Sequence, residues 1–326
     1  MRIRLHVSLA AAIFGCFATV LFAEPAKLYW TEEGFVGIKR SNLDGSQVEN
    51  VLATGENVAY LTASFSLEKL FYAVGSPTPQ LWSADLNGQN RQLLATFDDA
   101  NYVRGMAYDP ATQRLYWTSS HGYAAGNGKV HSANVDGSDV QQVLALSDNY
   151  PYGMAVDADS GRMFWANTLA ASLERASLDG TAREVIDSGA TSATSQLAID
   201  SVAQKLYWND PENNRIRWSN YDGSQAADIV ALSSAFTAYD SGIAVHHPSG
   251  SLFWSDTSTD RIYRARLDGS DPMIIIGSGL SNPGSMIVVG VPEPRSGLLM
   301  LAGLLLAVAA GWVRRSAVTH HPAAPR

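Results

Sequence analysis

The chain repeats one pattern six times: an aromatic pair, a short polar gap, a run of alternating residues and a turn that ends in glycine. The clearest copy spans residues 206–223. Leu206 and Trp208 fall on one face of a strand by period-two alternation. Asp222-Gly223 after such a run predicts a hairpin turn, in which both central residues would need a positive φ. This copy therefore predicts two strands joined by a loop and followed by a hairpin.

The turn glycines recur at a nearly constant spacing of 43, 49, 43, 43 and 46 residues, and they are Gly45, Gly88, Gly137, Gly180, Gly223 and Gly269. A short apolar strand follows each turn. Another, such as residues 153–157, precedes most of the aromatic pairs. Four strands in each unit of roughly 40 to 50 residues are typical of a β-propeller blade. A β-sandwich, in contrast, does not require the sequence to repeat at this period.

The ends of the repeat predict how the ring closes. The first aromatic pair, Tyr29-Trp30, begins too early in the chain for an inner strand to precede it, whereas residues 283–289 match the inner-strand pattern after the last turn. We expect this C-terminal inner strand to complete the first blade, so that no sheet edge stays open. The predicted fold of residues 24–290 is all-β, a six-bladed propeller of four-stranded antiparallel blades.

The aromatic pairs and Leu-Asp-Gly turns resemble the YWTD repeats of the low-density lipoprotein receptor family, which build six-bladed propellers. The resemblance covers nearly all of residues 24–290 and implies a module that binds protein partners on one face. The second repeat departs from the pattern because it lacks the tryptophan. The fourth motif position is Asp only at Asp210 and Asp256, and the residues at other copies are Glu32, Ser119 and Asn167.

The predicted propeller is strongly acidic. The chain has 23 Lys and Arg against 31 Asp and Glu, and six of the basic but only one of the acidic residues lie in the terminal segments. The propeller is left with 17 basic and 30 acidic residues, a net charge of about −13. Such a body would repel phosphate backbones, so no nucleic-acid partner is expected. Cys16 is the only cysteine and lies before the propeller, which can therefore form no disulfide.

Residues 1–23 have the parts of a secretory signal peptide. Arg2 and Arg4 precede an apolar run over residues 5–22, and the small residue Ala23 follows it. We predict that signal peptidase removes this segment. A buried strand or an uncleaved anchor is the alternative.

Residues 291–315 combine the parts of a membrane sorting tail. The parts are Pro292-Glu293-Pro294, an uncharged apolar run over residues 297–313, and Arg314-Arg315. The apolar run is near the lower limit for a transmembrane helix, and the arginine pair would stay cytoplasmic. This order resembles the PEP-CTERM signal of exported bacterial proteins. The resemblance implies processing by exosortase and delivery to the cell surface or exopolysaccharide matrix; a plain membrane anchor is the alternative. Residues 316–326 are a short tail.

No catalytic motif stands out. The sequence has no G-x-S-x-G, no H-E-x-x-H and no phosphate loop. We therefore predict no catalytic residue, no cofactor and no metal site. A structural role is expected for an aspartate that recurs at one blade position, as Asp109, Asp157 and Asp200. His246-His247 replaces it in the last blade, where hydrogen bonding is favoured over metal ligation.

Aromatic residues in the loops of one face are the best candidates for a ligand site. Loops before the inner strands and after the second strands share that face of a propeller. Rings with a polar tip suit sugar rings or peptide partners. The alternative is that several of them fill the apolar gap between blades. The candidates are Tyr102, His121, Tyr123, Tyr150, Tyr152 and Tyr239.

Two functions of different classes remain open. The first is a non-enzymatic binding module of the cell surface or matrix, with a protein or glycan ligand. The second is a metal-dependent propeller hydrolase or lactonase, which needs oxygen ligands that converge in the central channel. The binding module is favoured because the inner strands open with residues that supply no carboxylate, namely Gly105, Gly153, Gln196 and Gly242. A generic structural role in the matrix is a third possibility.

Overall fold

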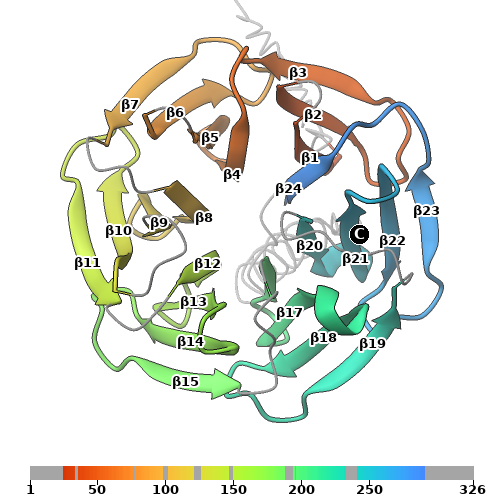
Figure 1. Cartoon of the computed structure of the whole chain (residues 1–326). Helices are drawn as coiled ribbons and strands as arrows, with labels where there is room; N and C mark the ends of the chain where they lie inside the picture. Colours follow the sequence, from red (N-terminus) through yellow and green to blue (C-terminus); the bar gives the residue numbers. More distant parts are fainter. Residues whose placement is uncertain are drawn as a thin grey trace, which may run out of the picture.

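The computed structural model describes residues 25–33, 36–75, 78–97, 102–120, 126–146, 150–187, 194, 196–232 and 241–290. These residues form six four-stranded antiparallel sheets, arranged as blades around a central channel (Figure 1). The expected all-β six-bladed propeller is confirmed. No helix among the described residues is long and apolar enough to span a bilayer.

Each blade runs outward from the channel, and its four strands follow each other in the sheet (Figure 1). The inner strands are β24 (Pro283–Val289), β4 (Val58–Ser64), β8 (Tyr102–Asp109), β12 (Pro151–Asp157), β16 (Leu197–Asp200) and β20 (Ile243–His246). The second strands are β1 (Lys27–Glu32), β5 (Lys69–Val74), β9 (Arg114–Ser120), β13 (Arg162–Asn167), β17 (Lys205–Asp210) and β21 (Ser251–Asp256).

The outer half of each blade holds the third and fourth strands. The third strands are β2 (Gly37–Asn42), β6 (Gln80–Asp85), β10 (Gly128–Asn134), β14 (Ser172–Ser177), β18 (Arg215–Asn220) and β22 (Arg261–Arg266). The fourth strands are β3 (Glu49–Ala53), β7 (Gln92–Thr96), β11 (Gln141–Leu146), β15 (Glu184–Asp187), β19 (Ala227–Ala231) and β23 (Met273–Ile276). Two short 3-10 helices complete the described elements, η1 (Pro211–Asn213) and η2 (His247–Ser249).

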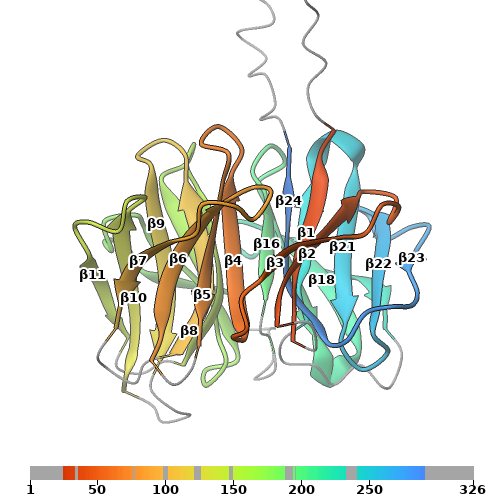
Figure 2. The same cartoon turned by 90° about the horizontal axis from the view of Figure 1, so that it is seen from above.

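The C-terminal strand closes the ring as expected. β24 pairs with β1 in the first blade, with Leu28 opposite Val288 and Trp30 opposite Met286. The start of β1 and the end of β24 therefore lie together at one face of the disc (Figure 2). We call this the hairpin face, because the six Gly turns lie there. The opposite face, where inner strands such as β4 and β8 begin, is called the entry face.

The hairpin turns differ in type from the expectation. In the first blade, the Gly45 amide donates to the Asn42 carbonyl over 3.0 Å, and Gly45 has φ +83°. Asp44 does not have a positive φ, so the turn is type I followed by a left-handed glycine. The prediction that both central residues need a positive φ is wrong. The Asp44 carboxylate instead accepts hydrogen bonds from the Ser46 amide and hydroxyl, which hold the aspartate in place.

Aromatic residues of the second strands fill the seams between blades. Leu28 and Trp30 cluster with Phe253 of the preceding blade, whereas Tyr29 clusters with Leu70 and Tyr72 of the following blade. Side chains alternate between the two faces of a strand, so the first and third residues of a run such as Leu28-Tyr29-Trp30 face the preceding blade and the middle residue faces the following blade. The expected pairing of faces is confirmed also in the fifth blade, where Leu206 and Trp208 share one cluster and Tyr207 belongs to another.

Glycines at the hairpin turns let each blade sit close against the one before it. A Cβ built on Gly137 would lie 2.3 Å from the Leu94 carbonyl oxygen, and one on Gly88 would lie 1.9 Å from that of Val51. Leu94 and Val51 lie on the fourth strand of the preceding blade. Glycine is therefore required at these turns for two reasons: its φ is positive, and a side chain would clash with the backbone of the preceding blade.

Side-chain pairs replace the missing aspartates of the fourth motif position. The pairs are Glu32 with Lys39 at 2.9 Å, Ser119 with His131 at 3.1 Å and Asn167 with Glu174 at 2.8 Å. Each pair joins a second strand to the neighbouring third strand. In the second blade the position is Val74, which packs in an apolar cluster. The blade architecture thus persists without the family's aspartate.

Candidate ligand site at the channel mouth

A cavity of about 230 Å³ opens on the entry face, where β4, β8 and β24 begin. Its lining includes Glu33, Asn57, Tyr60, Tyr102, Arg104 and Asn282. These residues come from the first three blades, so the site exists only because the ring places their inner strands side by side. The lining combines ring faces with amide and carboxylate groups.

Arg104 is the centre of an aromatic cluster beside this cavity. Its guanidinium carbon lies 5.1 Å from the ring centre of Tyr102, 5.2 Å from that of Tyr150 and 5.5 Å from that of Tyr152. Its Nε donates to the Ser120 hydroxyl at 3.4 Å. Three of the predicted aromatic candidates therefore do converge, and the residue that brings them together is an arginine.

A bulge in β8 aims the Arg104 side chain. Val103 pairs with Ser119 and Gly105 pairs with Thr118, so Arg104 is the extra residue between them. Gly105 is also required, because a Cβ there would lie 2.6 Å from the Met154 amide nitrogen of β12. Because Gly105 has no side chain, β12 can lie close against β8. This close approach places Tyr152 of β12 and the preceding residue Tyr150 near the Arg104 guanidinium.

Two of the candidate tyrosines are not exposed, as they were expected to be. Tyr150 and Tyr152 are 3% and 6% exposed, whereas Tyr102 is 40% exposed. The ring of Tyr152 packs edge-on against that of Tyr60, with 6.4 Å between the ring centres, and its centre lies 6.1 Å from that of Tyr150. These two rings follow the alternative instead, which is that some of the candidates fill the gap between blades, because the close approach of β12 to β8 buries them. They support the Arg104 side chain, and Tyr102 remains the ring that a ligand can reach.

The other predicted site residues lie outside the described residues. They are the loop candidates His121, Tyr123 and Tyr239, and the sorting-tail residues Pro292, Glu293, Pro294, Arg314 and Arg315.

Arg104 was missed by the sequence analysis, although a signal for it is present. It is the only lysine or arginine in the six inner strands. A cation in a strand that lines the channel needs a compensating environment, and the faces of three aromatic rings are part of it here. This lone arginine identifies position 104 as unusual. It does not identify the three tyrosines around it, because two of them come from another blade.

Most of the side chains on the described walls of the channel are apolar. A cavity of about 210 Å³ lies between the inner strands of the six blades, and its lining residues include no carboxylate. Within the described ranges, no group of three or more His, Cys, Asp or Glu is placed to hold a metal ion. The polar side chains on the lining are those of Thr62, Tyr108, Gln196 and Ser285.

The recurrent aspartates at the ends of the inner strands have structural contacts, which confirms their expected role. Asp109 accepts a hydrogen bond from the Ala111 amide at 2.9 Å. Asp200 lies 2.8 Å from the His247 Nδ1 of the next blade. The expected hydrogen bonding of the histidine pair is thus confirmed for His247. These contacts hold the hairpins between inner and second strands.

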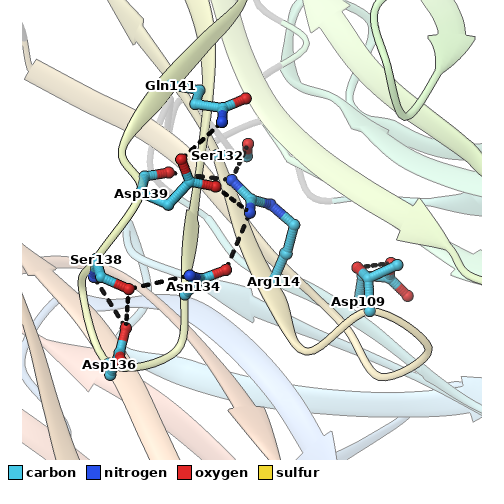
Figure 3. Close-up of polar contacts among 9 residues, drawn as sticks. Asp109, Arg114, Ser132, Asn134, Asp136, Ser138, Asp139 and Gln141 are labelled. Carbon is cyan, nitrogen blue, oxygen red and sulfur yellow. Dashed lines mark hydrogen bonds and ion pairs between the residues drawn. The ribbon is translucent and has the colours of Figure 1, made fainter.

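Polar networks organise the hairpin face around each turn. In the third blade, Arg114 reaches Asn134 at 2.9 Å and Asp139 at 2.8 Å (Figure 3). The Ser138 hydroxyl and amide lower the pKa of Asp136, and the hydrogen bond from Arg114 lowers the pKa of Asp139. A basic residue begins the second strand in five blades, a repeat the sequence analysis did not use. These residues are Lys27, Lys69, Arg114, Arg162 and Lys205.

Comparison with known proteins finds relatives with YWTD repeats, although no protein-family model matches the chain. A human low-density lipoprotein receptor-related protein 5-like protein is 24% identical over 159 residues, covering 49% of this chain and 61% of that protein. Low-density lipoprotein receptor-related protein 1 of Pyricularia oryzae is 36% identical over 107 residues, covering 30% and 35%. Protein cueball of Drosophila erecta is 31% identical over 130 residues, covering 37% and 19%. The chain spans less than two thirds of each of these relatives.

Solved structures with the same fold include a chain of a nidogen/laminin complex. Its TM-score is 0.70 at 16% identity, over 81% of this chain and 98% of that chain. TolB from Acinetobacter baumannii has a TM-score of 0.66 at 11% identity, over 81% of this chain and 66% of that chain. These identities show the fold alone. The chain is therefore a six-bladed propeller whose repeats are similar to those of low-density lipoprotein receptor-related proteins.

Proposed function

We propose that this protein is a non-enzymatic binding module that engages a protein or glycan ligand at the channel mouth of its entry face. The observation that carries the proposal is the convergence of exposed Tyr102 and half-buried Arg104 on one cavity. A ring with a polar tip beside a cation is a common anchor for ligands. The similar fold of a chain from a nidogen/laminin complex supports a ligand of macromolecular size.

A bacterial surface or matrix location is part of the proposal. The leader at residues 1–23 and the Pro-Glu-Pro tail at residues 291–315 support export, processing by signal peptidase and exosortase, and transient membrane anchoring. Because β1 begins and β24 ends at the hairpin face, a chain held by its tail would present the entry face to its surroundings. The Glu293→Ala variant should accumulate in the inner-membrane fraction; its normal release would contradict the sorting assignment.

The binding function is tested by a screen of glycans and proteins with the full-length chain in neutral detergent. Tyr102→Ala should weaken binding of whatever the wild type retains by at least tenfold, because Tyr102 is the exposed ring at the cavity. Val202→Ala removes an exposed apolar side chain (58% exposed) from the hairpin face and should bind as the wild type does.

Two results would contradict the proposal. Equal binding by Tyr102→Ala and the wild type would move the ligand site elsewhere. Stoichiometric calcium or zinc in the purified protein, with hydrolysis of esters or lactones lost on chelation, would favour the propeller hydrolase instead.

A further inference from the structure

We propose that Met273 is an oxidation site, at which a hydroperoxide converts the thioether to a sulfoxide whose oxygen is bound by Arg264. Met273 begins β23, the outermost strand of the sixth blade (Figure 1). The site is separate from the channel mouth and goes beyond the proposed binding function.

Met273 is the exposed methionine of the described residues. Its side chain is 48% exposed, whereas the other methionines of the described residues are 0 to 7% exposed. Those buried methionines are Met106, Met154, Met163 and Met286. Oxidation requires contact between the sulfur and the oxidant, so exposure decides which thioether reacts first. Among these five methionines, Met273 should therefore react first.

Arg264 already contacts the Met273 sulfur. The two residues lie directly opposite each other in the pairing of β22 with β23, and the Arg264 Nη2 donates to the Met273 Sδ at 3.4 Å. A thioether sulfur is a weak acceptor. A sulfoxide oxygen carries partial negative charge, and its hydrogen bond to a guanidinium is charge-assisted and stronger. Oxidation would therefore strengthen a contact that is already oriented.

The first and fourth blades have an arginine and a glutamate at this pair of positions. In the first blade, the Arg40 Nε donates to the Glu49 carboxylate at 2.9 Å, and in the fourth the Arg175 Nε donates to that of Glu184 at 2.5 Å. Both pairs lie opposite each other between the third and fourth strands, as the pair in the sixth blade does. The sixth blade thus keeps the arginine of this pair and has a thioether where the other two blades have a carboxylate.

A sulfoxide supplies the oxygen that the sixth blade lacks. The sulfur of methionine occupies the position that Cδ has in glutamate, and an oxygen bound to it takes the position of a glutamate Oε. Oxidised Met273 would therefore present an acceptor to Arg264 from the same distance along the side chain as Glu49 does to Arg40. The cross-strand pair of the first and fourth blades would then be present in the sixth as well.

The reaction balances with a hydroperoxide as the oxidant. A lone pair of the Met273 sulfur attacks the peroxide oxygen that carries hydrogen, so the S–O bond forms as the O–O bond breaks. The proton of the attacked oxygen moves to the leaving oxygen, which departs as water or an alcohol. The sulfur loses the two electrons that the peroxide gains. Methionine sulfoxide reductases can reverse the modification.

The first test measures which methionine reacts. The full-length wild-type chain, in peroxide-free neutral detergent, is treated with hydrogen peroxide, and each methionine is followed by peptide mass spectrometry. We expect Met273 to be oxidised at least tenfold faster than Met163, which is 0% exposed, and the two rates to become similar in urea. Equal rates in the folded protein would overturn the proposal.

The second test measures whether Arg264 binds the sulfoxide. Oxidation should shift the urea midpoint of the wild type upward relative to its effect on Arg264→Leu, which offers the sulfoxide oxygen no donor. Met273→Leu cannot form this sulfoxide, so its shift gives the effect of oxidation at all other positions and is subtracted. Equal corrected shifts in the wild type and Arg264→Leu would overturn the proposal.

A third comparison needs no oxidant. Met273→Gln places an amide oxygen where the sulfoxide oxygen would lie, whereas Met273→Leu has a similar size and no acceptor. The Gln variant should unfold at a higher urea concentration than the Leu variant, and Arg264→Leu should abolish the difference. A difference that persists without Arg264 would overturn the proposal.

Discussion

At the hairpin face the six blades present nearly the same structure, whereas at the entry face the inner strands begin with different residues. Each turn on the hairpin face is closed by a hydrogen bond from its glycine amide to the carbonyl three residues earlier, over 2.8 to 3.0 Å. On the entry face, β8 alone brings an arginine into an inner strand. The same four-stranded unit thus supports a repeated scaffold on one side and an individual site on the other.

The difference shows where a repeat protein can carry a specific function. Contacts on the hairpin face also join neighbouring blades, as when Arg40 donates to the Leu86 carbonyl of the next blade at 3.2 Å. A change there would disturb both the turn and the seam. The residues at the starts of the inner strands differ from blade to blade, although some of them also contact the neighbouring blade, as Tyr152 does through Thr118.

The largest effect is expected where the repeated face is most constrained. Gly137→Ala should destabilise the protein by about 2–4 kcal/mol, because it combines a positive φ with a backbone clash. Gly55→Ala is the matched control. Gly55 also has a positive φ (+74°), but a Cβ there meets nothing within 4 Å, so the loss should be about 1 kcal/mol.

Urea unfolding of both glycine variants measures the difference. Equal losses for Gly137 and Gly55 would mean that the close approach to Leu94 contributes nothing. The binding site should survive in a folded Gly137→Ala protein, since the substitution lies on the face away from Arg104. Lost ligand binding at full folding would break the proposed separation of the two faces.

A smaller effect is expected at a residue that links the scaffold to the site. The Thr118 hydroxyl donates to the Tyr152 carbonyl of the next blade at 2.7 Å, and both residues are buried. Thr118→Val leaves that carbonyl without this donor and should cost about 1–3 kcal/mol in the free energy of unfolding. It should also weaken ligand binding, because Tyr152 supports Arg104.

The conservative variant provides the control for Thr118. Thr118→Ser keeps the hydroxyl and should restore ligand affinity and most of the stability. Chemical unfolding and calorimetry check the two effects separately. If Thr118→Val binds like the wild type, Tyr152 does not position the guanidinium.

The smallest effect is expected at an exposed turn carboxylate and depends on pH. Hydrogen bonds from Ser138 hold the pKa of Asp136 below its ordinary value of 3.8. Because the pKa is lower in the folded state, its contribution to stability is present above about pH 4 and is lost as the pH falls through the folded-state pKa. Asp136→Asn should therefore be less stable than the wild type at pH 7, and the difference should shrink at pH 2.5.

Unfolding curves at the two pH values check this, with Ser138→Ala as the control that removes the hydroxyl hydrogen bond, the largest cause of the lowered pKa, and leaves the amide hydrogen bond in place. A wild-type advantage that persists undiminished at pH 2.5 would show that charge is not its source.

Much of the fold could be predicted from local residues, because each blade repeats the same strand and turn signals. Tyr29-Trp30 and its five counterparts indicated strands with two apolar faces, and the match of residues 283–289 to the inner strands indicated the closure by β24. The turn type was not predicted. Asp-Gly is compatible with more than one hairpin geometry, and the Asp44 contacts to Ser46 select the one observed.

The candidate site could be predicted only in part. Tyr102 was identified as a candidate ring for ligand binding, and its side chain is exposed beside the cavity. The burial of Tyr150 and Tyr152 could not be deduced from the residues themselves, because it depends on how closely β12 approaches β8 at Gly105. Arg104 was overlooked because its role depends on a bulge, and a bulge is a property of the pairing between strands rather than of one strand.

By itself, the sequence determined the six-fold repeat, the order of strands within a blade and the closing of the ring, since these follow from period-two alternation and from turn residues that act locally. Only the tertiary structure decided which residues form the channel mouth. Side chains such as Arg104 and Tyr152 are about fifty residues apart and meet only when neighbouring blades pack. The physical reason is that a blade buries its faces against its neighbours, so the geometry of a seam belongs to two blades at once.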